Sequence, residues 1–333
     1  MIVSIAIIAY NEEKTLPSLL EDIVNQDYPH EKIELLLINS VSQDSTLEIM
    51  QRFAADRIDF KRIVVLTNEN KTIPFGCNVA LDNYTGDAFV RIDAHASVPS
   101  DFISKSVRLL ESGEMVCGGK RPNIIDGENA WKQTLLTAEQ SMFGSGIAPY
   151  RNGEQKMYVR TIFHGLYRRE VYDVVGKYNE LLTRNEDNDM SQRINAAGFK
   201  MCYDPDIVSY QHSRNSLGKM LRQKYLNGYW IGKTMGINPR CFSLFHFIPF
   251  AFVMGILLTT VLWCVGFPYL AWLMWGLYGL LIFGISLVEI FSRKFSVTNL
   301  LLPFLFVALH ISYGVGTLVG LVEMPFWINK INK

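Results

Sequence analysis

The chain has 333 residues, which is enough for one large domain and a second region. Its 32 basic and 32 acidic side chains cancel, so no net positive charge attracts nucleic acid, and we exclude nucleic acid as a partner. The five cysteines are scattered without a Cys-x-x-Cys or Cys/His pattern. This spacing argues against a disulfide framework and a zinc site, and it favours a reducing environment for the charged part of the chain.

The first 240 residues carry nearly all of the charge and alternate between apolar runs and helical patterns. Continuous apolar runs predict buried parallel strands at residues 2–8, 33–38, 63–66 and 88–92. Helical spacing of apolar residues predicts helices at 13–26, 46–54 and 76–82. This alternation predicts βαβ units, and therefore an α/β fold with a doubly wound, mostly parallel sheet. The first apolar run lacks a basic segment before it, so we expect a strand there and no signal peptide.

Polar residues follow three of the predicted strands, at the sheet edge where such folds bind ligands. They are Tyr10-Asn11-Glu12, Asn39-Ser40 and Asp93-Ala94-His95. Because side chains two residues apart point the same way on an extended segment, we expect Asp93 and His95 to share a divalent ion with a diphosphate. A solvated turn with an incidental histidine is the alternative interpretation of the same residues.

Acidic residues begin a later predicted helix, in the sequence Glu186-Asp187-Asn188-Asp189. Carboxylates at a helix start commonly cap the helix or interact with its dipole. Three carboxylates exceed what a cap needs, and one of them is a candidate general base for an acceptor hydroxyl. The residues alone leave both interpretations open.

Residues 242–333 form an apolar region in which three stretches are long enough to cross a bilayer, at about 247–267, 269–291 and 300–322. Basic residues precede the first stretch, and Arg293 lies between the second and the third. The positive-inside rule therefore places residues 1–240 in the cytoplasm of a multi-pass protein of the inner (plasma) membrane. The third stretch would put Lys330 outside, so it is either re-entrant or an exception to the rule.

A basic and aromatic segment, residues 216–241, separates the predicted catalytic domain (1–215) from the membrane region (242–333). It contains Arg222, Gln223 and Trp230. Anchoring at the lipid–water interface explains this composition without a catalytic role.

Several motifs follow one another in a fixed order: Ala9-Tyr10-Asn11-Glu12-Glu13, Ile38-Asn39-Ser40, Gly76-Cys77-Asn78, Arg91-Ile92-Asp93-Ala94-His95-Ala96 and Arg184-Asn185-Glu186-Asp187. In this order they resemble the family 2 glycosyltransferases, which have a GT-A fold, over about residues 1–235. The chain looks similar to membrane-bound succinoglycan-type glucosyltransferases of exopolysaccharide synthesis. Those enzymes share Asp-Ala-His and the features present here as Phe143-Gly144-Ser145-Gly146 and Arg222-Gln223.

The resemblance implies a role for each matching residue. Residues that would bind the nucleotide-sugar are Ala9, Tyr10, Asn11, Glu12, Asn39, Asn78, Arg91 and Asp93. Asp93 and His95 would bind Mg²⁺ or Mn²⁺ against the diphosphate, and Asp187 would be the catalytic base. Candidates for contact with the acceptor or the diphosphate are Glu186, Arg222, Gln223 and Trp230. Family members usually have Asp where this chain has Asn39, whose carbonyl oxygen is also able to accept a hydrogen bond from uracil.

The resemblance also implies a reaction. We expect an inverting, metal-dependent transfer of a hexose, first of all glucose from UDP-glucose, to a polyprenyl-diphosphate-linked saccharide at the bilayer. The product would enter exopolysaccharide or a cell-surface glycan. One alternative is a processive polysaccharide synthase, but its Gln-x-x-Arg-Trp motif does not match the spacing of Arg222, Gln223 and Trp230. Another is a non-catalytic nucleotide-sugar-binding membrane subunit, which predicts loss of the base, yet Asp187 is present.

Overall fold

The structure, a computed structural model of the chain, describes residues 1–125, 127, 129–144, 153–213, 216–293 and 296–331. It divides into two compact units. The sheet unit comprises Met1–Ile124 and Ala148–His212, and the helical unit comprises Ile125–Ile147 and Ser213–Lys333. The predicted boundary after residue 215 lies close to the observed one, but the predicted catalytic domain was continuous, whereas Ile125–Ile147 belongs with the C-terminal helices.

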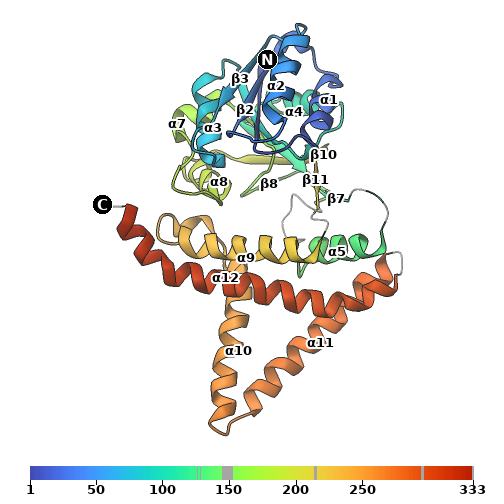
Figure 1. Cartoon of the computed structure of the whole chain (residues 1–333), viewed down its shortest axis with the longest axis vertical. Helices are drawn as coiled ribbons and strands as arrows, with labels where there is room; N and C mark the ends of the chain where they lie inside the picture. Colours follow the sequence, from blue (N-terminus) through green and yellow to red (C-terminus); the bar gives the residue numbers. More distant parts are fainter. Residues whose placement is uncertain (126, 128, 145–152, 214–215, 294–295, 332–333) are drawn as a thin grey trace. The chain divides into compact units, whose positions relative to one another are not determined.

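The first half of the sheet unit is built from parallel strands in the order β3-β2-β1-β4 (Figure 1). The strands are β1 (Val3–Ala9), β2 (Ile33–Asn39), β3 (Arg62–Thr67) and β4 (Ala88–Asp93). The helices between them are α1 (Leu16–Val24), α2 (Thr46–Asp56) and α3 (Ile73–Asn83), with a short 3₁₀ turn, η1 (His30–Lys32). Alternate residues of β1 enter cores on opposite faces, because successive strand side chains point to opposite sides. The predicted α/β fold is therefore confirmed.

The second half continues the same sheet in the order β9-β6-β10-β8, with β9 antiparallel to β4 and β6. Its strands are β6 (Val116–Lys120), β8 (Met157–Val159), β9 (Leu166–Arg168) and β10 (Met201–Val208). Its helices are α4 (Phe102–Glu111), α7 (Arg169–Val175) and α8 (Glu186–Ala196). A small sheet in the order β5-β11-β7 joins β5 (Ala96–Ser97), β11 (Tyr210–His212) and β7 (Asn123–Ile124). This small sheet holds the segment after Asp93 beside the end of β10.

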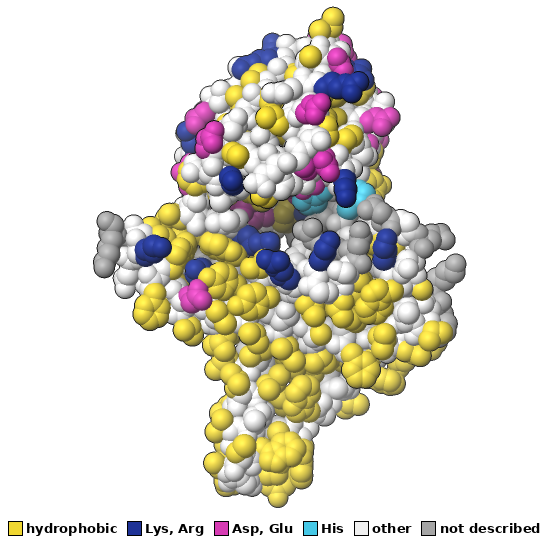
Figure 2. Space-filling model, in the orientation of Figure 1, with side chains coloured by type: hydrophobic (Ala, Val, Ile, Leu, Met, Phe, Trp, Pro, Cys, Tyr) yellow, Lys and Arg dark blue, Asp and Glu magenta, His cyan; other side chains and the backbone are white. Residues whose placement is uncertain are grey.

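Among its described residues, the helical unit contains three helices that are long and apolar enough to cross a membrane: Leu244–Cys264, Tyr269–Ser292 and Val297–Ile331. These stretches include η3 (Leu244–Phe247), α10 (Ile248–Cys264), α11 (Tyr269–Ser292), η4 (Val297–Leu301) and α12 (Leu302–Ile331). Helices α10 and α11 form a hairpin, whose turn has Gly266 at a positive φ of 93°. Figure 2 shows hydrophobic side chains over most of the visible surface of this hairpin.

The rest of the helical unit is α5 (Ala130–Gln140), α9 (Leu217–Thr234) and a 3₁₀ turn, η2 (Pro239–Cys241). Helix α5 belongs to this unit because Leu135 and Ala138 pack in one core with Phe306 of α12. Polar contacts add to this packing, since the Lys224 ammonium lies 3.0 Å from a carboxylate oxygen of Glu139. Of the predicted loop motif, Phe143 lies against Phe306, with ring centroids 5.7 Å apart, while Ser145 and Gly146 lie outside the described residues.

Candidate active site

The loops that follow β1 and β2 are joined by hydrogen bonds. The Asn11 side-chain oxygen accepts from the backbone N–H of Gln43 at 2.8 Å, and the backbone N–H of Glu12 donates to the Thr46 hydroxyl at 2.8 Å. Asn11 has a positive φ of 55°, a conformation that Asn tolerates better than most residues. Of the other predicted residues in this region, Ala9 is buried in the strand and Tyr10 is half exposed. The two loops therefore form one fixed edge at the carboxyl ends of the strands.

Two buried carboxamides lie at the ends of β2 and β3. The Asn39 oxygen accepts from the backbone N–H of Ser42 at 3.1 Å, so this side chain adds an N–H₂ donor that an aspartate would lack. Asn68 donates to the Ser40 hydroxyl at 3.0 Å, and its own oxygen is buried without a hydrogen-bond partner among the described residues. An unpartnered buried acceptor is the kind of group that a ligand donor satisfies.

Asp93, the last residue of β4, is surrounded by cationic side chains. One of its oxygens accepts from the Arg121 guanidinium at 2.7 Å, and the other lies 3.5 Å from Arg91. Burial alone would raise the pKa of Asp93, but the positive charges of Arg91 and Arg121 lower that pKa well below its usual value. Asp93 is therefore a carboxylate throughout the neutral range, and its charge is already compensated.

His164 lies beside Asp93 and is neutral. Its Nε2 lies 3.3 Å from the backbone nitrogen of Asp93 and 3.4 Å from an Asp93 carboxylate oxygen, and its Nδ1 is 3.0 Å from the Ser209 hydroxyl. Burial, reinforced by the charge of Arg121, lowers the pKa of His164 to about 4. Its φ of 46° is rare outside glycine and asparagine, and residues held in such conformations cluster at functional sites.

The second predicted metal ligand, His95, lies in a turn and not on the extended strand that we expected, because β4 ends at Asp93. Its Nδ1 is 3.1 Å from a carboxylate oxygen of Glu12. Strand β11 pairs with β5 beside this turn, and there His212 Nε2 lies 3.0 Å from the Ser97 hydroxyl. Among the described residues, no three His, Cys, Asp or Glu side chains gather into a complete ligand set.

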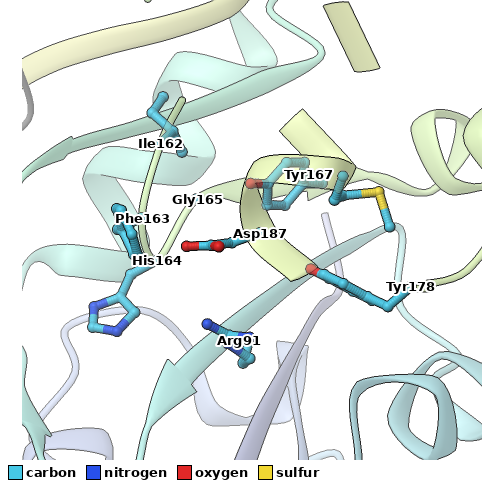
Figure 3. A pocket seen from close by; sticks show the side chains of 9 residues that line it. Arg91, Ile162, Phe163, His164, Gly165, Tyr167, Tyr178 and Asp187 are labelled. Atoms are coloured by element: carbon cyan, nitrogen blue, oxygen red, sulfur yellow. The ribbon is translucent and has the colours of Figure 1, made fainter. Parts of the chain in front are cut away.

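The first turn of α8 presents three carboxylates with different surroundings. Glu186 is buried and accepts from Arg91 at 3.0 Å, and burial, followed by the charge of Asp187, raises the pKa of Glu186. Asp189 is buried and lies 3.0 Å from Arg193. Asp187 is partly exposed and lines a small pocket with Arg91, Tyr178 and the 162–165 loop. Figure 3 shows the Asp187 carboxylate directed towards this loop. Of the three, Asp187 is therefore the one placed to meet a ligand.

Asn78 does not line this pocket but holds Tyr178, which does. Its amide group donates to the Tyr178 carbonyl at 3.0 Å and to Glu180 at 2.9 Å, and its oxygen accepts from the Tyr178 N–H at 2.9 Å. These bonds fix the 178–180 segment to α3, so Asn78 positions Tyr178 at the pocket wall. The predicted contact of Asn78 with the nucleotide-sugar stays a prediction.

The remaining predicted candidates lie on α9 in the helical unit. Arg222 is exposed and Gln223 is partly exposed. Trp230 packs edge-on against Trp327 of α12, with ring centroids 5.9 Å apart. Their predicted roles towards an acceptor or a diphosphate stay predictions.

Sequence reasoning did not identify three residues around Asp93: Arg121, His164 and Ser209. Each lies in a loop and reaches Asp93, directly or through His164, across 28 or more residues of sequence. Arg121 also lies 4.6 Å from the centre of the Phe163 ring. No local spacing signals such contacts, because they arise from the sheet order.

The chain matches Glycosyl transferase family 2 over residues 4–176. A dolichyl N-acetyl-alpha-D-glucosaminyl phosphate 3-beta-D-2,3-diacetamido-2,3-dideoxy-beta-D-glucuronosyltransferase of Methanococcus voltae is 24% identical over 329 residues, covering 96% of this chain and 97% of the relative. The succinoglycan biosynthesis protein ExoA of Rhizobium meliloti is 24% identical over 277 residues, covering 80% and 81%.

A solved structure with a similar fold is the mannosyltransferase PcManGT of Pyrobaculum calidifontis, in complex with GDP-Man and Mn²⁺. The TM-score is 0.63 at 18% sequence identity, and the match covers 95% of this chain and 86% of that one. The predicted GT-A fold is therefore confirmed, both by the order of the strands and by this similarity.

Proposed function

Since the chain belongs to glycosyl transferase family 2, we propose that it transfers a hexose from a nucleotide-sugar to a lipid-linked saccharide, with inversion at the anomeric carbon. The observation that carries this proposal is the position of Asp187. It is the one carboxylate of the first turn of α8 that lines the pocket, while Glu186 and Asp189 are engaged by Arg91 and Arg193. A base beside a pocket, next to a cluster of cations around Asp93, suits attack of a hydroxyl on a sugar diphosphate.

In the proposed reaction, Asp187 accepts the proton of the acceptor hydroxyl while that oxygen forms a bond to C1 of the donor sugar. The bond from C1 to the diphosphate oxygen breaks, and the nucleoside diphosphate leaves with the electron pair. Attack from the side opposite the leaving group gives a β-glycoside from an α-linked donor. Tyr178 and the 162–165 loop confine the acceptor beside Asp187 and exclude water from it.

We propose that the side chains at the end of β4 hold a divalent ion that is shared with a diphosphate. A Mg²⁺ or Mn²⁺ ion typically takes one or two protein ligands in such sites and fills its other positions with phosphate oxygens and water. Asp93 and His95 would bind it. The bound ion would supply neutralisation of the charge that grows on the diphosphate. Arg91 and Arg121 keep Asp93 ionised for this purpose.

We propose a uridine diphosphate sugar, with UDP-glucose first, as the donor. Asn39 and Asn68 would face the base, where the Asn39 N–H₂ is able to donate to a uracil carbonyl and the Asn68 oxygen is able to accept from the uracil N3–H. These two side chains would suit a base that has a hydrogen-bond acceptor next to a donor, as uracil has in its carbonyl group and its N3–H. Ala9, Tyr10, Asn11 and Glu12 would line the same pocket.

We propose a polyprenyl-diphosphate-linked saccharide as the acceptor, used at the cytoplasmic face of the plasma membrane. The long apolar helices of the helical unit suit a substrate with a polyprenyl tail. The relative from Methanococcus voltae, which matches over almost its whole length, is named for a dolichyl-phosphate-linked substrate. Arg222, Gln223 and Trp230 are the candidates for contact with the acceptor head group.

The test is the pair Asp187→Asn and Asp189→Asn, assayed with radiolabelled nucleotide-sugars and extraction of lipid-linked product. We expect Asp187→Asn to lower the transfer rate by about 10²–10⁴-fold, the usual contribution of a general base, with donor affinity nearly unchanged. Asp189→Asn is the matched control and should retain transfer if it folds. Wild-type rates in Asp187→Asn would overturn the assignment.

A further inference from the structure

Helix α9 cannot cross a bilayer. It carries Lys219, Arg222, Lys224 and Lys233 within 18 residues, and it is absent from the candidate membrane spans. Placing a cation at the centre of the hydrocarbon is costly, because the charge loses its hydration there. The first and last of these cations are about 21 Å apart along the helix, so no transmembrane position keeps all four out of a hydrocarbon core about 30 Å thick. Helix α9 must therefore lie at or above the membrane surface.

Helix α12 is locked to α9 along most of its length. The Ser312 hydroxyl donates to the Leu221 carbonyl at 2.8 Å, and Trp327 packs on Trp230 near the other end. Between these points the backbones meet at glycines: a Cβ on Gly316 would lie 2.1 Å from the Tyr225 oxygen.

Gly320 and Gly228 make the same kind of contact. A Cβ on Gly320 would lie 2.0 Å from the Tyr229 oxygen, and one on Gly228 would lie 2.0 Å from the Tyr313 oxygen. Residues with higher numbers on α9 contact residues with higher numbers on α12, so the two helices run parallel. Glycine contacts of this kind bring helices into backbone contact and exclude lipid from between them. Helix α12 must therefore follow the direction of α9.

The start of α12 is also attached to a polar helix. The Asn299 side chain, just before α12, accepts from the Thr134 hydroxyl of α5 at 2.6 Å, and His310 lies 3.0 Å from the Phe143 carbonyl. Helix α5 contributes Glu139, which is paired with Lys224 of α9. Both ends of α12 are thus held beside charged helices, and Figure 1 shows α12 running along α9 and α5 while the α10–α11 hairpin leaves them steeply.

The side of α12 away from α9 is apolar and exposed. Phe304, Ile311, Val322 and Phe326 lie on one face of the helix by its 3.6-residue period, and Phe304 and Phe326 are 72% and 75% exposed. These side chains extend over about 33 Å of helix length. A long apolar face opposite a charged layer is typical of a helix in the plane of the lipid–water interface.

We propose that α12 does not cross the bilayer but lies in the plane of its surface, and that the α10–α11 hairpin alone enters the hydrocarbon. The partner of the exposed face of α12 is then the lipid bilayer. The sheet unit, α9 and the end of α12 lie on the same side of the membrane. This topology places Lys330 with the other cations, which removes the conflict with the positive-inside rule that a third span creates.

Cysteine labelling in sealed vesicles of both orientations tests the topology. Cys77, Cys117 and Cys202 are buried, so Cys241→Ser with Cys264→Ser gives a background for single cysteines. In this background we expect Asn329→Cys, at the end of α12, to react with a membrane-impermeant maleimide from the same side as Gln51→Cys on α2. Both positions are exposed. Labelling of Asn329→Cys from the opposite side would overturn the proposal.

The native Cys264, close to the hairpin turn, supplies the complementary measurement in the Cys241→Ser variant. It should react from the opposite side or only after detergent is added, and reaction from the side of Gln51→Cys would contradict the insertion of the hairpin. Nitroxide labels at Phe304, Ile311 and Phe326 then report depth. Equal depths support the in-plane helix, and a profile with Ile311 deep and the two ends at opposite surfaces overturns it. These readouts do not depend on sugar transfer, so they stand or fail separately from the proposed function.

Discussion

The two units are stabilised in opposite ways. The sheet unit concentrates buried charge at one strand end, where Asp93, Arg91, Arg121 and Glu186 form one cluster. The helical unit instead joins its longest helix to α9 mainly by backbone contact at glycines. Buried charges respond to pH, whereas contacts at glycines respond to added volume. The candidate site is therefore built on buried charges, whereas the joint between α9 and α12 depends on close backbone packing.

The largest expected effect that sharpens this contrast concerns His164. Because its pKa is lowered from 6.5 to about 4 in the folded state, the unfolded chain binds a proton between these values that the folded chain does not. Folding stability should therefore fall as pH decreases from 6.5 to 4, by up to about 3 kcal/mol.

The control for that effect is His164→Asn, which keeps a polar side chain that tolerates a positive φ. Melting temperatures of the two proteins in detergent, measured at pH 7 and pH 4.5, should differ more for the wild type. An equal loss in both proteins would show that His164 does not carry this pH dependence.

A smaller effect is expected from added volume in the helical unit. In Gly320→Ala the new Cβ meets the Tyr229 oxygen at 2.0 Å, so we expect a destabilisation of about 1–3 kcal/mol that is independent of pH. Gly276→Ala in α11 is the matched control, because a Cβ there meets nothing within 4 Å among the described residues. The measurement is thermal unfolding of both variants at two pH values. Equal stability of the two would contradict the close packing of α9 and α12.

The smallest effect is expected at Asn39, where the change is one of specificity. Asn39→Asp replaces an N–H₂ donor by a carboxylate that accepts from the Ser42 N–H and from a base N–H. We expect affinities for uridine and other nucleoside diphosphates to change by about tenfold relative to one another, as for one hydrogen bond of about 1–1.5 kcal/mol. Competition binding with a panel of nucleoside diphosphates measures this ratio, and an unchanged ratio would remove Asn39 from the base pocket.

The sequence predicts the first half of the sheet well because its evidence is local. Strands β1 to β4 are continuous apolar runs, and the polar residues after them mark the edge of the sheet. The role of His164 is not local: its neutral state depends on Arg121 and Ser209, which the sheet order brings to it. The selection among Glu186, Asp187 and Asp189 depends likewise on Arg91 and Arg193, which occupy the other two carboxylates.

Hydropathy likewise identifies α12 as a candidate membrane helix but contains no information on its direction. The direction of α12 is set by the glycines of α9 and α12. Their spacing indicates a close helix–helix contact only once the structure shows that the two helices are neighbours. The place of α5 in the helical unit is likewise not local, because Leu135 and Ala138 join a core with Phe306, which is distant in the sequence.

Residues 125–147 lie between two parts of the sheet unit in sequence but belong to the helical unit. This segment has a practical consequence for making a soluble enzyme. Truncation after residue 215 removes α9 and α12 but leaves α5 attached. Leu135 and Ala138 of α5 then lose the helices that bury them. Such a fragment would expose a hydrophobic surface on α5 and would aggregate during expression. A water-soluble version requires two changes. The C-terminal helices are deleted, and a short flexible linker replaces residues 125–147 between β7 and β8.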